Sequence, residues 1–441
     1  MDKKSKEPEE RFAEYVEQLI AALAHADRAE PCRAYLAGLL LPGERKSVEP
    51  MAARIDPHGT RARHQSLHHF VAHAPWDERE LLRAARDYAL GEVQGQGEQA
   101  AWAVDDTGLP KQGKHSVGVA LQYCGALGKQ ANCQVAVSIS LVSEQASLPC
   151  AYRLYLTEEW ARDEARRKAA GVPEEVPFSA KWEIALEELD RLLAAGAPRA
   201  PVVADAWYGD VTEFREGLQA RGLQYAVGIR ARTTVWPPGV IPHPPPRRGS
   251  RGPTPQRLRR GPGQQPLAVA ELAQQLPARA WRTVRWRAGS QGPLQSRFAA
   301  VRVRAAHRDH KRRAPREEEW LLVEWPAGEP EPTKYWLANL PAQTALRQLV
   351  RVVKLRWRIE RDYEELKDEL GLDHYEGRNW RGFHHHAALC IAAYAFLVVE
   401  RARFSPRWSD PPAGQPPTFI KAPALPAGFR PRGAATADGT P

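Results

Sequence analysis

The hydrophobic residues of the first 95 positions recur at steps of three and four, which is the spacing of amphipathic helices. Four stretches show this spacing, and Pro and Gly residues separate them: 11–24, 33–41, 66–74 and 78–90. We therefore predict that residues 1–95 form an N-terminal helical domain. Helical modules of this kind are common in DNA-binding proteins, although they also serve many other purposes.

After residue 100 the hydrophobic period changes to two, which is typical of strands. An apolar run at 101–104 and alternating segments at 116–124 and 132–142 predict three antiparallel strands. Helical and strand-like segments then alternate in the order 178–195, 200–204, 211–222 and 224–229. The order βββαβαβ is that of a mixed α/β sheet. We assign residues 96–231 to the first part of this domain.

A segment rich in Pro, Gly and Arg interrupts the α/β pattern. Residues 236–263 are too rich in Pro for regular structure and predict a flexible basic arm. Short strands are predicted at 281–286, 298–303 and 319–325, so residues 232–333 form a β-rich basic insertion. A further strand at 335–339 either completes this unit or returns to the main sheet.

The segment 346–372 predicts one long amphipathic helix whose apolar seam turns polar half-way along. Arg356, Glu360 and Lys367 lie along one side of that helix. An apolar helix follows at 384–401. Residues 334–403 therefore form the second part of the α/β domain, and 404–441, rich in Pro and Gly, predict a disordered tail.

The net charge of +10 is distributed unevenly along the chain. Residues 230–313 hold 19 Lys or Arg against two acids, so the remainder is slightly acidic. This local excess favours a polyanionic partner. The five cysteines form no CxxC pair, and no signal sequence or apolar run of about 20 residues is evident. We expect a soluble protein of the bacterial cytoplasm, associated with the nucleoid and not with a membrane.

Three carboxylates are candidates for a metal site. Asp105 and Asp205 each follow a strand-like apolar run, and Glu360 lies on the long helix. Carboxylate oxygens suit Mg²⁺, and two such ions can activate an attacking oxygen and stabilise a leaving one. A single Asp after a strand is more often a turn former or helix cap, and Asp106, followed by Thr107 and Gly108, fits that use.

Three sequence blocks in order resemble the IS701-type transposases of the DDE superfamily, which are related to the IS4 group. The first is DDTGLPKQGKHSVGV from Asp105, and the second is ADAWYGD from Ala204. The third is Arg356, Glu360 and Lys367, which match the R-x3-E-x6-K core of the IS4-type signature. One departure is Val353, which stands where that signature has a Tyr.

The resemblance implies an RNase H-like fold with Asp105, Asp205 and Glu360 as catalytic metal ligands. Asp106 remains the alternative first ligand, and Mn²⁺ is the alternative to Mg²⁺. The implied activity is cleavage at terminal inverted repeats of double-stranded DNA, followed by strand transfer into target DNA, by a homodimer in a synaptic complex. The competing hypothesis is a non-catalytic DNA-binding remnant that acts as a repressor.

DNA contacts are predicted from basic residues near these blocks and in the arm. The candidates are Arg356, Lys367, Lys111, Lys114, Arg247, Arg248, Arg259 and Arg260. Trp207 and Tyr208 could stack on a base, but packing against the catalytic helix is the favoured interpretation. Consecutive His384, His385 and His386 cannot all face one metal ion on a helix, so we place them on the surface at a helix start.

Overall fold

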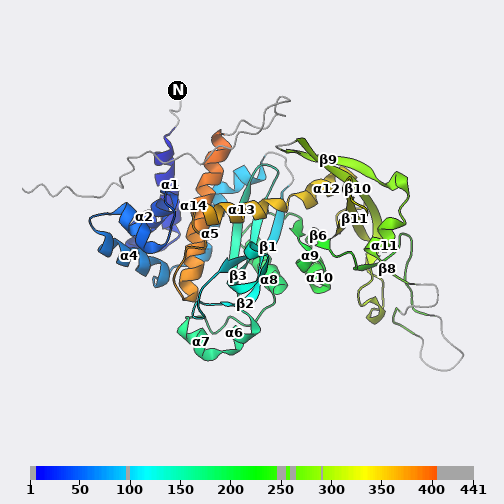
Figure 1. Ribbon diagram of the computed structural model, residues 1–441, viewed down its shortest axis with the longest axis horizontal. Helices are drawn as coiled ribbons and strands as arrows, with labels where there is room; N and C mark the ends of the chain where they lie inside the picture. The colour runs from blue at the N-terminus through cyan, green and yellow to red at the C-terminus, as the bar shows by residue number, and fades with distance from the viewer. Residues whose placement is uncertain (1–5, 96–99, 246–254, 259–264, 290–291, 405–441) are drawn as a thin grey trace, which may run out of the picture.

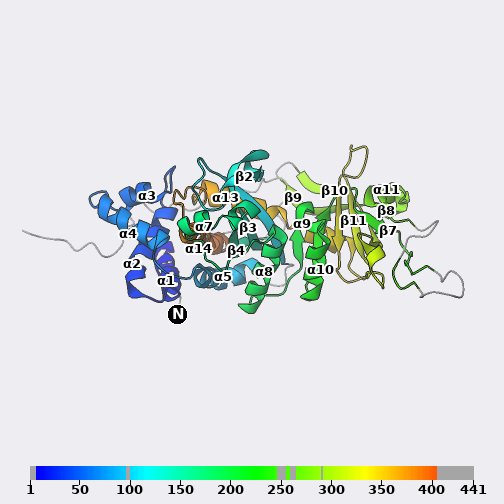
Figure 2. The ribbon, with the colours of Figure 1, turned by 90° about the horizontal axis from the view of Figure 1, so that it is seen from below.

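The computed structural model describes residues 6–95, 100–245, 255–258, 265–289 and 292–404. The molecule is elongated, with the N-terminal helices at one end and the β-rich insertion at the other (Figures 1 and 2). A single sheet runs between these ends. The predicted tail and the four arginines of the predicted arm, Arg247, Arg248, Arg259 and Arg260, lie outside the described residues.

The N-terminal part is helical, as predicted. Its helices are α1 (Pro8–Ala21), α2 (Ala29–Leu40), α3 (Val48–Ile55), α4 (Thr60–Ala72) and α5 (Glu78–Gln94), with a short 3-10 turn, η1 (Ala26–Arg28). The four predicted helices are all present. Helix α3 was not predicted, because its eight residues are too few to establish a period.

These helices pack around α14 (Trp380–Phe404), the last helix described (Figure 1). The Tyr15 hydroxyl donates to the Ala392 carbonyl at 2.8 Å, and the Tyr35 hydroxyl lies 2.8 Å from Nδ1 of His386. Arg11 pairs with the buried carboxylate of Glu400, with Nε 2.8 Å from Oε1. The N-terminal helices therefore share their core with the C-terminal helix, and the boundary at residue 95 stays a prediction.

One mixed sheet of twelve strands forms the centre of the molecule, in the order β2-β3-β1-β5-β6-β12-β11-β10-β7-β8, with β4 beside β3 and β9 beside β10. The strands are β1 (Ala101–Pro110), β2 (Ala120–Cys124), β3 (Lys129–Val142), β4 (Ser147–Tyr155), β5 (Val202–Ala204), β6 (Tyr225–Ile229), β7 (Thr234–Trp236), β8 (Leu267–Ala268), β9 (Arg282–Gly289), β10 (Gly292–Ala305), β11 (Glu319–Trp325) and β12 (Lys334–Ala338). Strand β5 pairs in parallel with β1 and β6, and the other pairings are antiparallel. This mixed α/β architecture agrees with the predicted RNase H-like fold.

At β1 the sheet is buried on both faces, because alternate side chains of this strand enter two different cores. Trp102 and Val104 face the large core shared with the N-terminal helices, whereas Ala101 and Ala103 face a second core with the helix that follows the insertion. The remaining helices are α6 (Glu158–Arg162), α7 (Glu164–Ala169), α8 (Lys181–Ala194), α9 (Ala206–Gly209), α10 (Thr212–Ala220) and α11 (Val269–Gln274), with 3-10 turns η2 (Gly125–Leu127), η3 (Ala278–Ala280) and η4 (Asp309–Lys311).

The insertion extends the main sheet and does not form a sheet of its own. Strand β12 pairs with β6 on one side and with β11 on the other. Of the two alternatives left open for 335–339, the return to the main sheet is therefore correct. Within the predicted arm, residues 236–245 and 255–258 are described, and Leu258 is buried, with its N–H donated to the Arg312 carbonyl at 2.8 Å.

The predicted single helix 346–372 is wrong. The structure has two consecutive helices, α12 (Leu346–Lys354) and α13 (Trp357–Asp368), which are joined through Leu355 and Arg356. The N–H groups of Leu355, Arg358 and Ile359 all bond three residues back, as in a 3-10 turn. This turn interrupts the α-helical hydrogen bonding, although Leu355 and Arg356 both keep right-handed helical backbone angles.

Helix α14 corrects the expectation about apolar runs. Residues 380–403 are long and apolar enough to cross a membrane, but the whole of their most apolar window is buried inside the protein. The helix is therefore placed as a core helix. His384, His385 and His386 lie on it and are buried, not on the surface as predicted, and each ring bonds a backbone carbonyl.

Candidate active site

Asp105 and Asp205 lie side by side because of the parallel register between β1 and β5. Val104 is paired with Ala204, and the two aspartates are the next residues on these strands. Neighbouring strands lie about 4.8 Å apart, so both carboxylates emerge at the same level of the sheet. The sequence prediction that two strands deliver these side chains to one site is consistent with this register.

Asp105 does not end its strand, although we predicted that it would. Strand β1 continues to Pro110 because its other edge is hydrogen-bonded to β3, with Asp105 opposite Ser138 and Asp106 opposite Val137. Only the parallel pairing with β5 ends before Asp105. Asp106 is therefore a strand residue and not a turn former, and its Oδ2 lies 2.7 Å from Nζ of Lys181.

Asp205 ends β5 and caps the short helix α9. Its Oδ1 accepts the backbone N–H groups of Trp207 at 2.9 Å and Tyr208 at 3.4 Å. These N–H contacts fix the orientation of the carboxylate beside Asp105.

Glu360 reaches the pair of aspartates through Arg356. The Arg356 guanidinium places Nη1 2.8 Å from Oδ2 of Asp105, and its Nη2 bonds Oε1 of Glu360. The Glu360 side chain is 56% exposed, whereas that of Asp105 is only 15% exposed. The guanidinium therefore links the helix carboxylate to the strand carboxylates.

The electrostatics of the group follow from burial and crowding. Burial raises the pKa of Asp105 to about 7, Arg356 opposes this rise, and Asp205 adds to it. Burial also raises the pKa of Asp205. Burial disfavours the charged form of Arg356, but attraction to Asp105, Glu360 and Asp205 raises its pKa overall. Both aspartates are therefore harder to ionise than a free Asp, and a nearby cation favours their charged forms.

The donor set suits a hard divalent cation, but the side chains are not arranged around one point. Within the described ranges, no three His, Cys, Asp or Glu side chains come together closely enough to hold a metal ion. The guanidinium of Arg356 instead lies between Asp105 and Glu360. Three carboxylates can supply oxygen ligands for Mg²⁺ once that guanidinium moves aside.

The predicted basic residues are divided between the site and other contacts. Lys367, on α13, donates to the Gly108 carbonyl at 3.2 Å, further along β1 than Asp105. The Lys111 ammonium donates to the carbonyls of Asp373 at 3.2 Å and Tyr375 at 2.7 Å, which is an internal contact. Lys114 is exposed.

The two aromatic residues that follow Asp205 differ in burial. Tyr208 is buried, but Trp207 is 68% exposed and does not pack against the catalytic helix as we predicted. The Arg230 guanidinium lies 4.8 Å from the centre of the Trp207 ring. Arg230 was missed in the sequence, although it directly follows strand β6 and the carboxyl end of a parallel strand is where such residues gather.

Helix α13, which carries Glu360, is anchored by contacts that the sequence did not reveal. The Tyr363 hydroxyl lies 2.7 Å from Oγ of Ser138 on β3, and Oδ2 of Asp362 accepts from Ser147 at 2.5 Å. On the insertion side, the Arg287 guanidinium lies 3.7 Å from the centre of the Trp357 ring. These contacts hold α13 between the main sheet and the β9–β10 hairpin.

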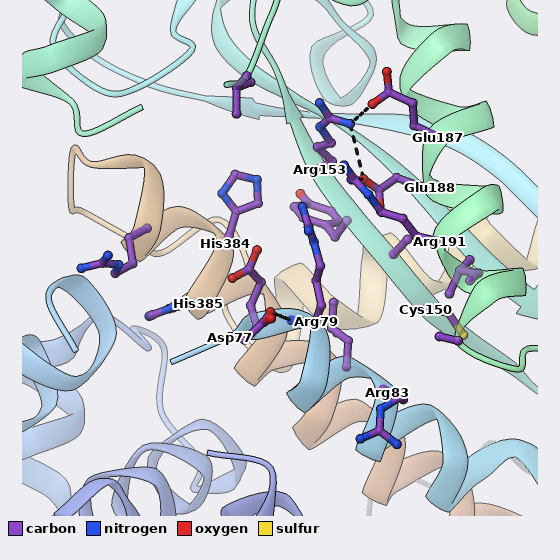
Figure 3. A pocket seen from close by; sticks show the side chains of 18 of the residues that line it. Asp77, Arg79, Arg83, Cys150, Arg153, Glu187, Glu188, Arg191, His384 and His385 are labelled. Atoms are coloured by element: carbon purple, nitrogen blue, oxygen red, sulfur yellow. Dashed lines mark hydrogen bonds and ion pairs between the residues drawn. The ribbon is translucent and has the colours of Figure 1, made fainter. Parts of the chain in front are cut away.

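A cavity of about 630 Å³ lies elsewhere, between the N-terminal helices, β4, α8 and the start of α14 (Figure 3). Its lining pairs opposite charges: Arg153 and Arg191 both contact Glu188. None of the three candidate carboxylates lines it. The cavity is therefore separate from the carboxylate site.

Comparison with known proteins decides the family. A family model described as a DDE superfamily endonuclease matches residues 18–293, which is more than half of the chain. The chain belongs to this DDE endonuclease superfamily. The match includes Asp105 and Asp205 and ends before Glu360.

A curated relative supports the IS701 resemblance over part of the chain. A protein of Microchaete diplosiphon described as a probable transposase for insertion sequence element IS701 is 31% identical over 172 residues. That alignment covers 39% of this chain and 42% of the relative, so it spans less than half of either protein. The DDE endonuclease family and its RNase H-like fold, both predicted from the sequence blocks, are confirmed.

Proposed function

We propose that this DDE endonuclease is a DNA transposase that cuts DNA at the terminal inverted repeats of its own element and joins the freed end to target DNA. The observation that carries the proposal is the parallel register that sets Asp105 beside Asp205, with Glu360 joined to Asp105 through Arg356. The IS701-type relative adds support over the segment that it shares.

In this proposal Asp105, Asp205 and Glu360 hold Mg²⁺, with Mn²⁺ as a substitute. Bound metal supplies an activated attacking oxygen and balances charge on the leaving oxygen. The chain's own residues orient the DNA. Lys367 lies two turns beyond Glu360 on α13 and faces the strand backbone next to it. Its ammonium is placed to meet a phosphate beside the site.

Under this proposal Arg356 contacts carboxylates in the free protein and a DNA phosphate in the complex. In the free protein it neutralises Asp105 and Glu360. A cation held by the carboxylates would supply that neutralisation instead, and the planar fork of the Arg356 guanidinium would then suit a DNA phosphate. The residue thereby couples the filling of the site to the arrival of the substrate.

The competing proposal, a repressor-like remnant without chemistry, rests on the departure at Val353. The structure shows that Val353 is buried in the core beneath α12. A side chain at this position points into the core and does not face DNA. The departure is therefore compatible with an intact cleavage site.

The test uses the full chain and a labelled duplex that carries the inverted repeat flanking its reading frame. With Mg²⁺ the protein should cut at the element end and, with a second duplex, produce joined product. Asp105→Asn, Asp205→Asn and Glu360→Gln should each abolish cutting while binding to the duplex persists. Glu364→Gln, an exposed carboxylate one turn along α13, is the matched control and should cut normally. Specific binding without cutting by the unaltered chain would favour the remnant.

A further inference from the structure

Trp207 is the most unusual side chain at the edge of the carboxylate site. It is 68% exposed, although Trp is a residue that folded proteins mostly cover, while the adjacent Tyr208 is 2% exposed. It lies two residues after Asp205, whose carboxylate accepts the Trp207 backbone N–H at 2.9 Å. A large aromatic ring is thus held open to solvent beside a candidate catalytic residue.

The backbone that carries the Trp207 ring packs closely against strand β6. A Cβ atom added to Gly209 would lie 1.9 Å from the Gly228 carbonyl oxygen, and one added to Gly228 would lie 3.1 Å from the Ala206 backbone nitrogen. Glycine at these two positions lets α9 lie directly against β6. The indole therefore projects from a fixed support and not from a loose loop.

A cation accompanies the ring. The Arg230 guanidinium lies 4.8 Å from the ring centre, and its Nε lies 3.3 Å from Oδ2 of Asp210. The Arg230 side chain remains 38% exposed, so it can still meet a phosphate. An exposed aromatic ring beside an accessible guanidinium is the pairing that binds bases together with their backbone.

The position of this pair along the sheet also matters. Asp105 lies on β1, Asp205 directly follows β5 and Arg230 directly follows β6, and these are neighbouring strands. Trp207 and Arg230 therefore lie on the side of the aspartates that leads toward the insertion. A DNA strand that crosses the carboxylates toward the basic insertion passes over this ring.

We propose that Trp207 and Arg230 form a stacking platform for an unpaired nucleobase of the DNA strand at the carboxylate site; this rests on the proposed DNA cleavage. Inside a duplex each base is covered on both faces by its neighbours in the stack, whereas an unpaired base can turn out of the stack and offer a face to the indole. The platform would select ends whose last bases are open, and Arg230 would hold the adjoining phosphate.

The test measures binding without metal, so that it is independent of cutting. The probe is a 30-base-pair duplex with three unpaired nucleotides at one end and 2-aminopurine among them, titrated in EDTA. Stacking on Trp207 should quench the 2-aminopurine fluorescence. Trp207→Ala should lose the quench and bind this probe about tenfold more weakly, whereas Trp207→Phe should keep most of both.

Two controls separate stacking from a general loss of fold or charge. All variants should bind the fully paired duplex within about twofold of the unaltered chain. Tyr123→Ala removes another exposed aromatic side chain, which is 55% exposed on β2, and should leave the quench unchanged. Equal binding and quenching by Trp207→Ala would overturn the platform, as would an effect confined to the association of the protein with itself.

The outcomes also distinguish the platform from the proposed function. A Trp207-dependent quench in a protein that never cuts its inverted repeat would leave the platform standing and sink the cleavage proposal. If the unaltered chain cuts its inverted repeat and Trp207→Ala behaves like it in the binding test, the cleavage proposal stands and the platform fails.

Discussion

The Nη1 atom of Arg356 lies 2.8 Å from Oδ2 of Asp105, and the same guanidinium bonds Glu360. Asp205 also contributes to the raised pKa of Arg356. An internal cation thus balances the carboxylates that we propose as metal ligands. Metal and guanidinium then compete for the same negative charge.

Arg356→Gln should destabilise the metal-free protein, because it leaves neighbouring carboxylates without their counter-charge. We expect a loss of about 2 kcal/mol in the free energy of unfolding. Added Mn²⁺ should restore stability, so the metal-induced rise in melting temperature should be larger than in the unaltered chain. Thermal unfolding with and without Mn²⁺ measures both effects.

Arg351→Gln is the control for that experiment, since Arg351 pairs with Glu144 on the surface, away from the aspartates. It should change neither the melting temperature nor the response to Mn²⁺ by a comparable amount. An Arg356→Gln protein that gains no more from Mn²⁺ than the unaltered chain would show that the guanidinium does not compete with metal.

Asp105 and Asp106 should differ sharply when each is changed to Asn. Asp105→Asn removes a carboxylate beside Asp205 and should reduce cutting of the inverted repeat by about a thousandfold. Asp106→Asn breaks a partly exposed pair with Lys181 and should cost less than about 1 kcal/mol in stability while cutting stays within severalfold of normal. Cleavage rates and melting temperatures of the two variants decide which aspartate is the ligand, and the opposite ranking would assign Asp106.

Gly209→Ala should disturb the support of both Asp205 and Trp207. The new Cβ would lie 1.9 Å from the Gly228 carbonyl oxygen, so α9 must shift away from β6. We expect a loss of about 1–3 kcal/mol in stability, together with a fall in cutting. Gly125→Ala, where an added Cβ meets no atom within 4 Å, should leave both measurements unchanged. Normal cutting by Gly209→Ala would mean that the seating of α9 does not position Asp205.

The buried histidines of α14 should make the protein sensitive to acid. Burial lowers the pKa of His386 to about 4, and in the unfolded chain the group titrates near its usual value of about 6.5. Between these two pH values the unfolded chain takes up a proton that the folded chain does not, so stability falls as the pH falls through this range.

His386→Gln isolates this effect. The free energy of unfolding of the unaltered chain, relative to the variant, should decline by about 1.4 kcal/mol per pH unit between pH 6 and 4.5. Urea unfolding at several pH values gives this difference directly. A constant difference across the range would mean that His386 is not held neutral in the folded protein.

The sequence predicted the strands best where one face or both faces are uniformly apolar. Strand β11 has the predicted bounds, 319–325, because its apolar run is closely bounded by polar residues and proline. Strand β1 was cut short in the prediction, since Asp105, Asp106 and Gly108 are turn formers. Its second half is held by hydrogen bonds to β3, and a local pattern does not report a distant partner.

At the candidate site, too, the local contacts were predicted and the features that depend on distant partners were not. The spacing on one helix face joined Arg356 to Glu360, and the structure has that contact. The break at Leu355 and Arg356 was missed, because both halves keep helical spacing and only the packing of α12 on the insertion and α13 on β1, β3 and β4 requires a turn. The prediction also placed Trp207 in a packed position and the three histidines on the surface, and the structure shows the reverse for both. Residue type alone favours a buried Trp and exposed His.

The packing of α14 against the N-terminal helices has a consequence for synthesis on the ribosome. Helices α1, α2, α4 and α5 are made first, but the helix that completes their core is made last. Glu360 also emerges only after the insertion. A nascent or truncated chain therefore lacks both a finished N-terminal module and a complete set of carboxylates. Under the proposed function, a chain that stops before α13 and α14 would not cut DNA, so partial products would leave the host chromosome intact.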